Sequence, residues 1–182
     1  MLEKISDHLY LFRDTCNVYV VTDSSRALLV DFGSGRVLDH LGDVGVSQVD
    51  WILHTHHHRD QCQGDSLANE RNISIAVPAH ELPYFEEVEV FWGSRQIYDI
   101  YDVRQTFFTL AQSVRTARVL EDYEAFEWGP YSFSIQPSPG HTLGHIALVA
   151  EIDGARVAFS GDLISAPGKT QTLYDLQYAY GA

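Results

Sequence analysis

The sequence is poor in cysteine, in basic residues and in long apolar runs. Its only two cysteines, Cys16 and Cys62, are not spaced as zinc knuckles or dithiol redox motifs require. It has 12 lysines and arginines against 25 aspartates and glutamates, a formal net charge of −13, which disfavours binding to nucleic acid or to an anionic membrane surface. No apolar stretch reaches the length of about 18 residues that a transmembrane helix needs. These shortages argue against a redox or zinc-knuckle motif, a nucleic-acid partner and a membrane-spanning protein.

The remaining composition is that of a packed globular protein. Hydrophobic residues make up 45% of the 182 residues and aromatic residues 12%, which is enough for one core and too little for two domains. We therefore expect one domain over residues 1–182. Two thiols fit a reducing compartment, and the opening MLEKISDHLYLF has no apolar run of signal-peptide length. These features predict a cytoplasmic protein.

Short apolar runs bounded by turn residues recur along the chain. Helical spacing is predicted at 36–41 and 65–71, and two-residue hairpin turns at Gly129-Pro130 and Asp153-Gly154. Strands are predicted at 8–13, 16–22, 26–31, 49–53, 73–77, 125–128, 131–136, 146–152 and 156–160. Because strands and helices alternate in the first half, the pattern indicates an α/β layer arrangement.

The segment 79–110 has helical propensity and is rich in aromatic side chains. We interpret these side chains as packing in the core or between helices, with a substrate lid or a dimer surface as the alternative. They are Tyr84, Phe85, Phe91, Trp92, Tyr98, Tyr101, Phe107 and Phe108.

Four of the nine histidines lie between positions 54 and 58, at the end of a predicted strand. Residues two apart in an extended segment point to the same side, so His56, His58 and Asp60 could converge on one cation while His57 points away. His57 is then expected at the surface or in support of a ligand. An earlier register would use His54 and His56, but the later one adds a carboxylate that can hold a second ion or take a proton. We prefer the later register.

Two more predicted strand ends carry potential ligands. Pro139-Gly140-His141-Thr142 places a histidine after a glycine turn, and Phe159-Ser160-Gly161-Asp162 places a carboxylate at the tip of another. Each motif is weak alone. Together with the histidine cluster, they make three strand ends that carry potential ligands. The first carries two histidines and an aspartate, the second a histidine and the third an aspartate.

The segments HTHHHRDQ, SPGHTLGH and FSGD, in this order, resemble the metallo-β-lactamase superfamily, and the resemblance spans nearly the whole chain. It implies a four-layer αββα sandwich with metals at the sheet edge. It also implies a first metal site of His56, His58 and His141, a bridging Asp162, and Asp60 in a second site. LLVDFGSG, residues 28–35, resembles the early strand of the superfamily, which makes Asp31 a buried loop-orienting residue. His145 is expected either to support the site through a hydrogen bond or to contact substrate.

The sequence departs from the family pattern in two places. Gln61 follows Asp60 where the family has a histidine, and no histidine follows His145. We therefore expect the second metal site to be weak, altered or empty. We also interpret the chain as part of a longer domain with its C-terminal part missing, and expect an open sheet edge to favour a homo-oligomer.

The expected activity is that of a metal-dependent hydrolase. Zinc held by neutral histidines would lower the pKa of bound water, and Asp60 would orient the nucleophile or move its proton. The expected substrate is a small ester, thioester, lactone or amide, and the PGHT motif resembles glyoxalase II relatives. One or two zinc ions are expected, with iron or manganese as alternatives. Two other hypotheses stay open: a non-haem iron oxidoreductase of the persulfide dioxygenase or flavodiiron type, and a metal-binding module without catalysis.

Overall fold

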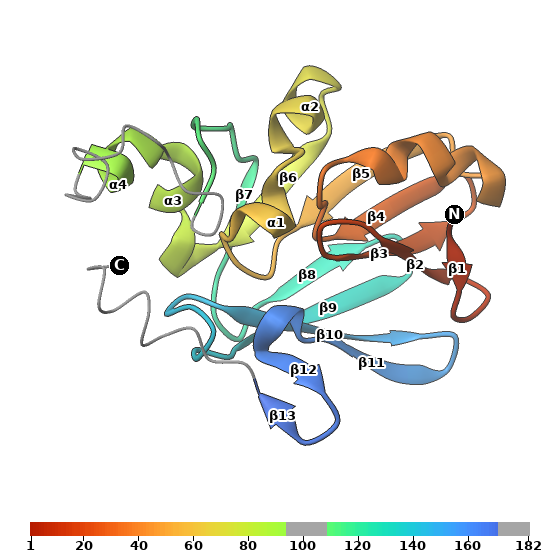
Figure 1. Ribbon diagram of the computed structural model, residues 1–182. Helices are drawn as coiled ribbons and strands as arrows, with labels where there is room; N and C mark the ends of the chain where they lie inside the picture. The colour runs from red at the N-terminus through yellow and green to blue at the C-terminus, as the bar shows by residue number, and fades with distance from the viewer. Residues whose placement is uncertain (94–108, 171–182) are drawn as a thin grey trace.

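Two β-sheets packed face to face form the centre of the computed structural model, which describes residues 1–93 and 109–170 (Figure 1). The first sheet has seven strands in chain order, antiparallel from β1 to β4 and parallel from β4 to β7. Its strands are β1 (Glu3–Lys4), β2 (Leu9–Arg13), β3 (Asn17–Asp23), β4 (Arg26–Val30), β5 (Gln48–Leu53), β6 (Ser74–Pro78) and β7 (Arg118–Leu120).

The second sheet is antiparallel, with the order β11-β10-β9-β8. Both predicted two-residue turns are confirmed, because Trp128 pairs with Tyr131 and Ile152 pairs with Ala155. A separate two-stranded pair follows. The strands are β8 (Ala125–Trp128), β9 (Tyr131–Pro137), β10 (Ile146–Ile152), β11 (Ala155–Phe159), and the pair β12 (Ile164–Ala166) and β13 (Lys169–Thr170).

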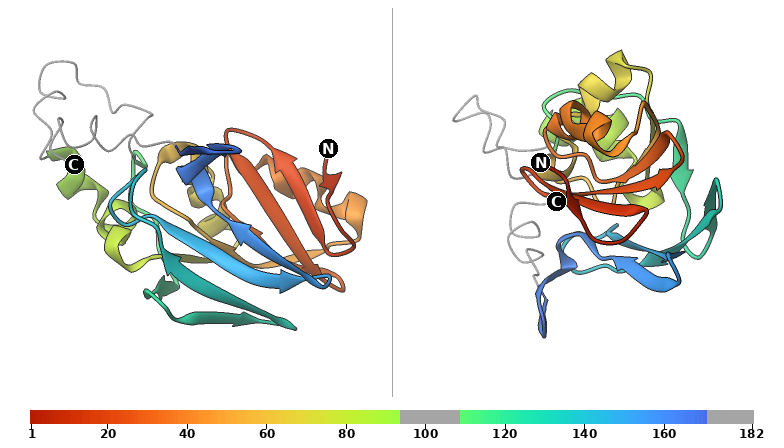
Figure 2. Two further views of the ribbon diagram at one scale, coloured as in Figure 1. Left: turned by 90° about the horizontal axis from the view of Figure 1, so that it is seen from below. Right: turned by 90° about the vertical axis from the view of Figure 1, so that its right-hand side faces the viewer.

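The α-helices lie on the side of the seven-stranded sheet that faces away from the second sheet (Figure 2). The helices are α1 (Arg59–Cys62), α2 (Asp65–Glu70), α3 (Pro83–Glu86) and α4 (Val88–Gly93), with 3-10 turns η1 (Arg36–Val44), η2 (Ala79–Glu81) and η3 (Gly161–Leu163). Within residues 1–93 and 109–170, no α-helix covers the outer face of the second sheet, and no helix has the length and apolar character needed to cross a membrane. The predicted α/β sandwich is confirmed, and the described residues supply its two sheets and one helical layer.

Strand β4 lies between two apolar cores, which explains why its last four residues, 27–30, are all hydrophobic. Ala27 and Leu29 belong to the cluster beneath the helices, whereas Leu28 and Val30 belong to the cluster between the two sheets. Successive side chains of a strand point to opposite faces, so burial of both faces requires an apolar residue at every position. Because both faces of β4 are buried, the end of the strand has a defined position, and Asp31 follows it there.

The segment predicted to be helical over 79–110 is only partly described. It begins with the short elements η2, α3 and α4 rather than one long helix, and 94–108 lie outside the described residues. Phe85, Phe91 and Trp92 are buried in the cluster beneath the helices, which supports the packing interpretation for these three. The predictions for four of the aromatic residues fall outside the described part: Tyr98, Tyr101, Phe107 and Phe108.

The β10–β11 turn is held against the N-terminal segment by Asp153. Its carboxylate accepts hydrogen bonds from Ser6 Oγ at 2.6 Å and from the His8 backbone at 2.8 Å, and it lies 2.5 Å from His8 Nδ1. Burial would raise the pKa of Asp153, but the bonds from Ser6 and His8 outweigh it and lower the pKa to about 2. We call this contact the Asp153 clasp.

Candidate metal centre

The histidine cluster lies where the parallel strands β4, β5 and β6 end. The loop between β5 and α1 carries residues 54–58, and the side chains alternate in direction, as extended backbone requires. His54 and His57 each turn to a carboxylate, whereas His56 and His58 turn to His141 in the loop between β9 and β10. Carboxyl ends of parallel strands are where open α/β sheets place their sites.

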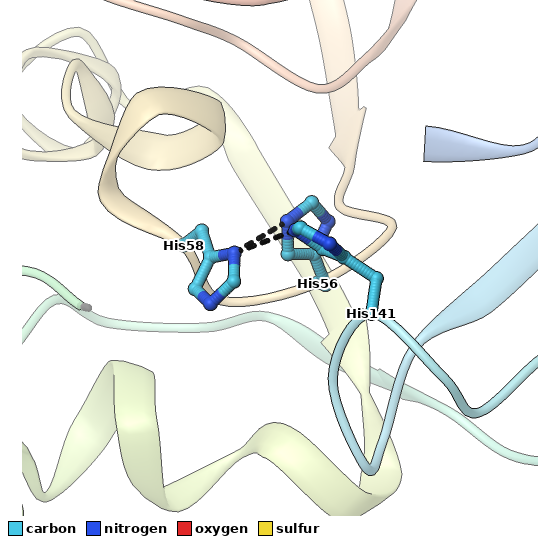
Figure 3. Close-up of side chains that lie close together, drawn as sticks. All are labelled: His56, His58 and His141. Atoms are coloured by element: carbon cyan, nitrogen blue, oxygen red, sulfur yellow. Dashed lines mark hydrogen bonds between the residues drawn. The ribbon is translucent and has the colours of Figure 1, made fainter. Parts of the chain in front are cut away.

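Three imidazoles meet at one point (Figure 3). His58 Nδ1 lies 3.2 Å from His56 Nε2 and 2.8 Å from His141 Nε2, and the three nitrogens all lie within 4.8 Å of one another. A tetrahedral zinc ion with bonds of about 2.0–2.1 Å needs nitrogens about 3.3 Å apart. The three histidines therefore fit such an ion with small adjustments.

Charge and tautomer also suit metal binding. Burial lowers the pKa of His58 to about 2 and that of His56 well below its usual value, and the neighbouring imidazoles add to the effect. Thr55 Oγ1 donates its one proton to Asp31, so it accepts from His56 Nδ1 at 3.0 Å. This tautomer leaves the lone pair of His56 Nε2 facing the other two imidazoles.

The contacts of His54 with two carboxylates disfavour the alternative register, in which His54 and His56 would be the ligands. Its Nε2 lies 3.0 Å from Asp65 Oδ1 and its Nδ1 lies 3.5 Å from Asp31 Oδ1, with the His54 side chain fully buried. Burial lowers the pKa of His54, but the carboxylates of Asp65 and Asp31 outweigh it and raise the pKa to about 9. A protonated imidazole has no lone pair to give a metal.

His57 does point away from the other ligands, as predicted, but it is not at the surface. It is 3% exposed, its Nδ1 lies 2.9 Å from Glu81 Oε2, and its ring stacks on Tyr84 at 4.1 Å between centroids. The surface alternative for His57 was wrong because extended backbone sets only the direction of a side chain, whereas helices packed on that side bury it.

Asp31 joins the end of β4 to the histidine loop. Its carboxylate accepts hydrogen bonds from the Thr55 backbone and hydroxyl at 2.9 Å each, and the residue is 2% exposed. It adopts a positive φ of 57°, which is uncommon outside glycine but more frequent for aspartate. The structure thus gives Asp31 the contacts that a loop-orienting role requires.

Neither of the two predicted acidic ligands belongs to the group formed by the three histidines. Asp162, in η3, has its Oδ2 3.7 Å from His141 Nε2. Burial, with the nearby carboxylates of Asp60 and Asp31, raises its pKa to about 6. Burial likewise raises the pKa of Asp60. Within the described part of the chain, the group of mutually close ligand atoms contains only the three histidines.

Gln61 and His145 occupy different surroundings. Gln61 is 1% exposed and lines a cavity of about 90 Å³ together with Asp31 and Asp162. His145 is fully buried, and its Nδ1 lies 2.8 Å from Ser138 Oγ. That burial favours a supporting role for His145 over contact with substrate.

Glu81 was not identified from the sequence. This residue ends η2, directly after β6, and is fully buried against His57 and Thr142. Its position after a parallel strand that neighbours β5 is the one signal that could have identified it.

The chain is similar to known proteins both in sequence and in fold. The family model of the metallo-β-lactamase superfamily matches residues 11–180. Hydroxyacylglutathione hydrolase of Albidiferax ferrireducens is 29% identical over 83% of this chain and 48% of its own length, and that of Hahella chejuensis is 26% identical over 86% and 50%. The chain thus spans about half the length of the curated relatives it matches.

Solved metallo-β-lactamases share the fold. FEZ-1 from Legionella gormanii superimposes with a TM-score of 0.68 at 19% identity, covering 93% of this chain and 66% of that one. An enzyme from Cronobacter sakazakii with a HARLDQ motif gives a TM-score of 0.68 at 14% identity, covering 87% and 63%. With the family match over most of its length and the same fold, the chain belongs to the metallo-β-lactamase superfamily.

Proposed function

We propose that the chain carries the metal centre of a hydrolase that cleaves a thioester of the hydroxyacylglutathione class. The observation that carries the proposal is the meeting of three buried imidazoles from two loops, His56, His58 and His141. These residues would hold one zinc ion. The ion would supply a positive charge and a water of lowered pKa.

Side chains around the three histidines are proposed to position the water and to move its proton. Neutral ligands leave the charge of the ion uncompensated, so its electrophilic strength is retained. Asp162 lies beside His141, with its Oδ2 3.7 Å from His141 Nε2, and its carboxylate is proposed to accept a proton from the attacking water or to contact the ion. Asp60 is proposed to orient the attacking water. Asp31 holds the histidine loop through Thr55.

The substrate class is inferred from the relatives. The curated proteins that match this chain are named hydroxyacylglutathione hydrolases, whereas the solved β-lactamases are less than 25% identical and support only the fold. We therefore favour a small thioester over a β-lactam.

We further propose that one ion is bound strongly and a second weakly, if at all. Gln61 stands where the family pattern has a histidine, and a neutral amide is a poor substitute for imidazole. The HARLDQ motif of the Cronobacter sakazakii enzyme likewise ends in Asp-Gln, as Asp60-Gln61 does in the segment HHHRDQ. This similarity indicates that the fold accepts a glutamine directly after this aspartate.

The test combines metal analysis with turnover. Protein purified without added metal should contain about one zinc per chain, and it should release free thiol from a hydroxyacylglutathione while leaving a β-lactam intact. His141→Ala should lose both the metal and the thiol release, whereas His80→Ala, an exposed histidine, should keep both.

Two outcomes would contradict the proposal. Stoichiometric iron together with oxygen consumption would favour the oxidoreductase hypothesis. Zinc bound without thiol release from any thioester, in protein extended to the length of its relatives, would favour the non-catalytic module.

A further inference from the structure

Glu81 joins the two loops that carry the three histidines. Its Oε2 accepts from His57 Nδ1 at 2.9 Å, and its Oε1 accepts from Thr142 Oγ1. His57 lies between His56 and His58, and Thr142 follows His141 directly. One buried carboxylate therefore contacts the immediate sequence neighbours of all three histidines.

The surroundings of Glu81 show that this contact is closely packed. The residue is fully buried, and a Cβ added at Gly144 would collide with Glu81 Cγ. The absence of a side chain at Gly144 therefore lets the loop between β9 and β10 lie directly on the carboxylate. A backbone hydrogen bond from Ile146 N, at the start of β10, to Thr55 O at 3.0 Å also connects the two segments.

The carboxylate is charged in this position. Burial alone would raise the pKa of Glu81, but the imidazole of His57 and the hydrogen bonds from His57 and Thr142 outweigh it and lower the pKa. A carboxylate accepts hydrogen bonds more strongly than a neutral amide does. Glu81 can thus hold both loops at once.

We infer that Glu81 is a positioning residue for the metal centre, which sets the distance between His141 and the pair His56 and His58. The inference rests on the proposed function, because it takes these histidines to be the ligands. Metal binding requires ligand atoms at defined distances and angles, so loosening either contact of Glu81 should weaken binding. Loss of groups that orient metal ligands costs about 10- to 100-fold in affinity.

The test measures zinc affinity by competition with a chromophoric chelator. Wild-type protein must bind zinc, and failure at this step would refute the proposed function rather than the role of Glu81. We expect Glu81→Gln to weaken binding about 10- to 100-fold and Thr142→Val about 10-fold. Thr142→Ser keeps the hydroxyl and should restore affinity to within about twofold of the wild type.

The chain provides matched controls at its surface. Thr116 Oγ1 also donates to a glutamate, Glu86, in a contact that is exposed to solvent. Glu86→Gln and Thr116→Val therefore remove the same chemical contact elsewhere and should leave zinc affinity unchanged. The double variant Glu81→Gln/Thr142→Val should lose less affinity than the product of the single losses, because both changes break one contact.

A spectroscopic measurement separates positioning from stability. Cobalt substituted for zinc should give an altered visible absorption spectrum in Thr142→Val and an unaltered one in Thr142→Ser and in the control variants. Unchanged affinity and an unchanged cobalt spectrum in both Glu81→Gln and Thr142→Val, with only the melting temperature lowered, would overturn the inference. Should Glu81→Gln fail to fold, the comparison of the two Thr142 variants still decides the outcome.

Discussion

Replacing His54 by alanine should destabilise the protein strongly and leave its metal in place, whereas replacing His58 should remove the metal at a smaller cost in stability. The two residues lie four positions apart in one loop, but their contacts differ. His54 lies between Asp65 and Asp31, at 3.0 and 3.5 Å, and stacks on Phe85. His58 lies 3.2 and 2.8 Å from the two other histidines.

The magnitude for His54 follows from its burial. Both His54 and Asp65 have fully buried side chains, and removing one partner of a buried charged pair costs about 3–5 kcal/mol because the other charge stays buried. For a domain of this size, 1 kcal/mol corresponds to about 2–4 °C in melting temperature. We therefore expect His54→Ala to melt roughly 6–20 °C below the wild type. His58→Ala in metal-free protein should cost about 1–3 kcal/mol, an ordinary value for a core substitution.

The metal affinities should change in the opposite sense. His58→Ala removes one of three ligands and should weaken zinc binding by more than about 100-fold, beyond the loss expected for a supporting residue. His54→Ala should remain within about tenfold of the wild type, a range that allows for loosening of the loop.

Two assays on the same preparations measure these effects. Thermal unfolding in the presence of a chelator reports stability without metal, and chelator competition reports zinc affinity. His40→Ala is the control, because His40 also lies near a carboxylate, Asp43 at 3.6 Å, but is 37% exposed and outside the site. Loss of zinc in His54→Ala with retention in His58→Ala would refute the reasoning and restore the earlier ligand register.

Three further predictions concern other parts of the molecule. Gln61→His should raise the zinc content from about one to about two ions per chain, measured by elemental analysis, and an unchanged content would contradict the account of a weak second site. Asp153→Asn should lower the free energy of unfolding at pH 7, because it breaks the Asp153 clasp. The folded pKa of Asp153, about 2, lies below the unfolded value of about 3.9, so the difference from wild type should be present above pH 4 and shrink as the pH falls towards 2. Denaturant titrations at several pH values would test this. Gly161→Ala should lower the melting temperature more than Gly154→Ala does. Both glycines have positive φ, but an added Cβ at Gly161 would lie 2.6 Å from His145 Nε2, whereas one at Gly154 would meet no atom within 4 Å. Equal decreases in melting temperature would show that backbone strain alone matters.

Sequence patterns located the strands best where hydrophobic alternation and turn residues agreed. The predictions for 125–128 and 146–152 coincide with β8 and β10, because each strand has one face buried and ends in a two-residue turn. Strand β7 was missed: it has only three residues, and its pairing with β6 comes from a segment about forty positions earlier. Local periodicity has no information about such a partner.

The ligand set was predictable in outline for a similar reason. The spacing of His56 and His58 placed both on one side of an extended segment, and the structure brings them together with His141. The roles of Asp60 and Asp162 stay predictions, since neither lies within the group of three histidines.

The sequence by itself determined which residues alternate, where the chain turns, and that imidazole and carboxylate groups lie at strand ends. These properties depend on a few neighbouring residues. Only the tertiary structure decided which histidines point towards one another, because that depends on carboxylates from other segments: Asp65 contacts His54, and Glu81 contacts His57. Burial of those partners arises from the packing of the helices on the sheet, which no local pattern records.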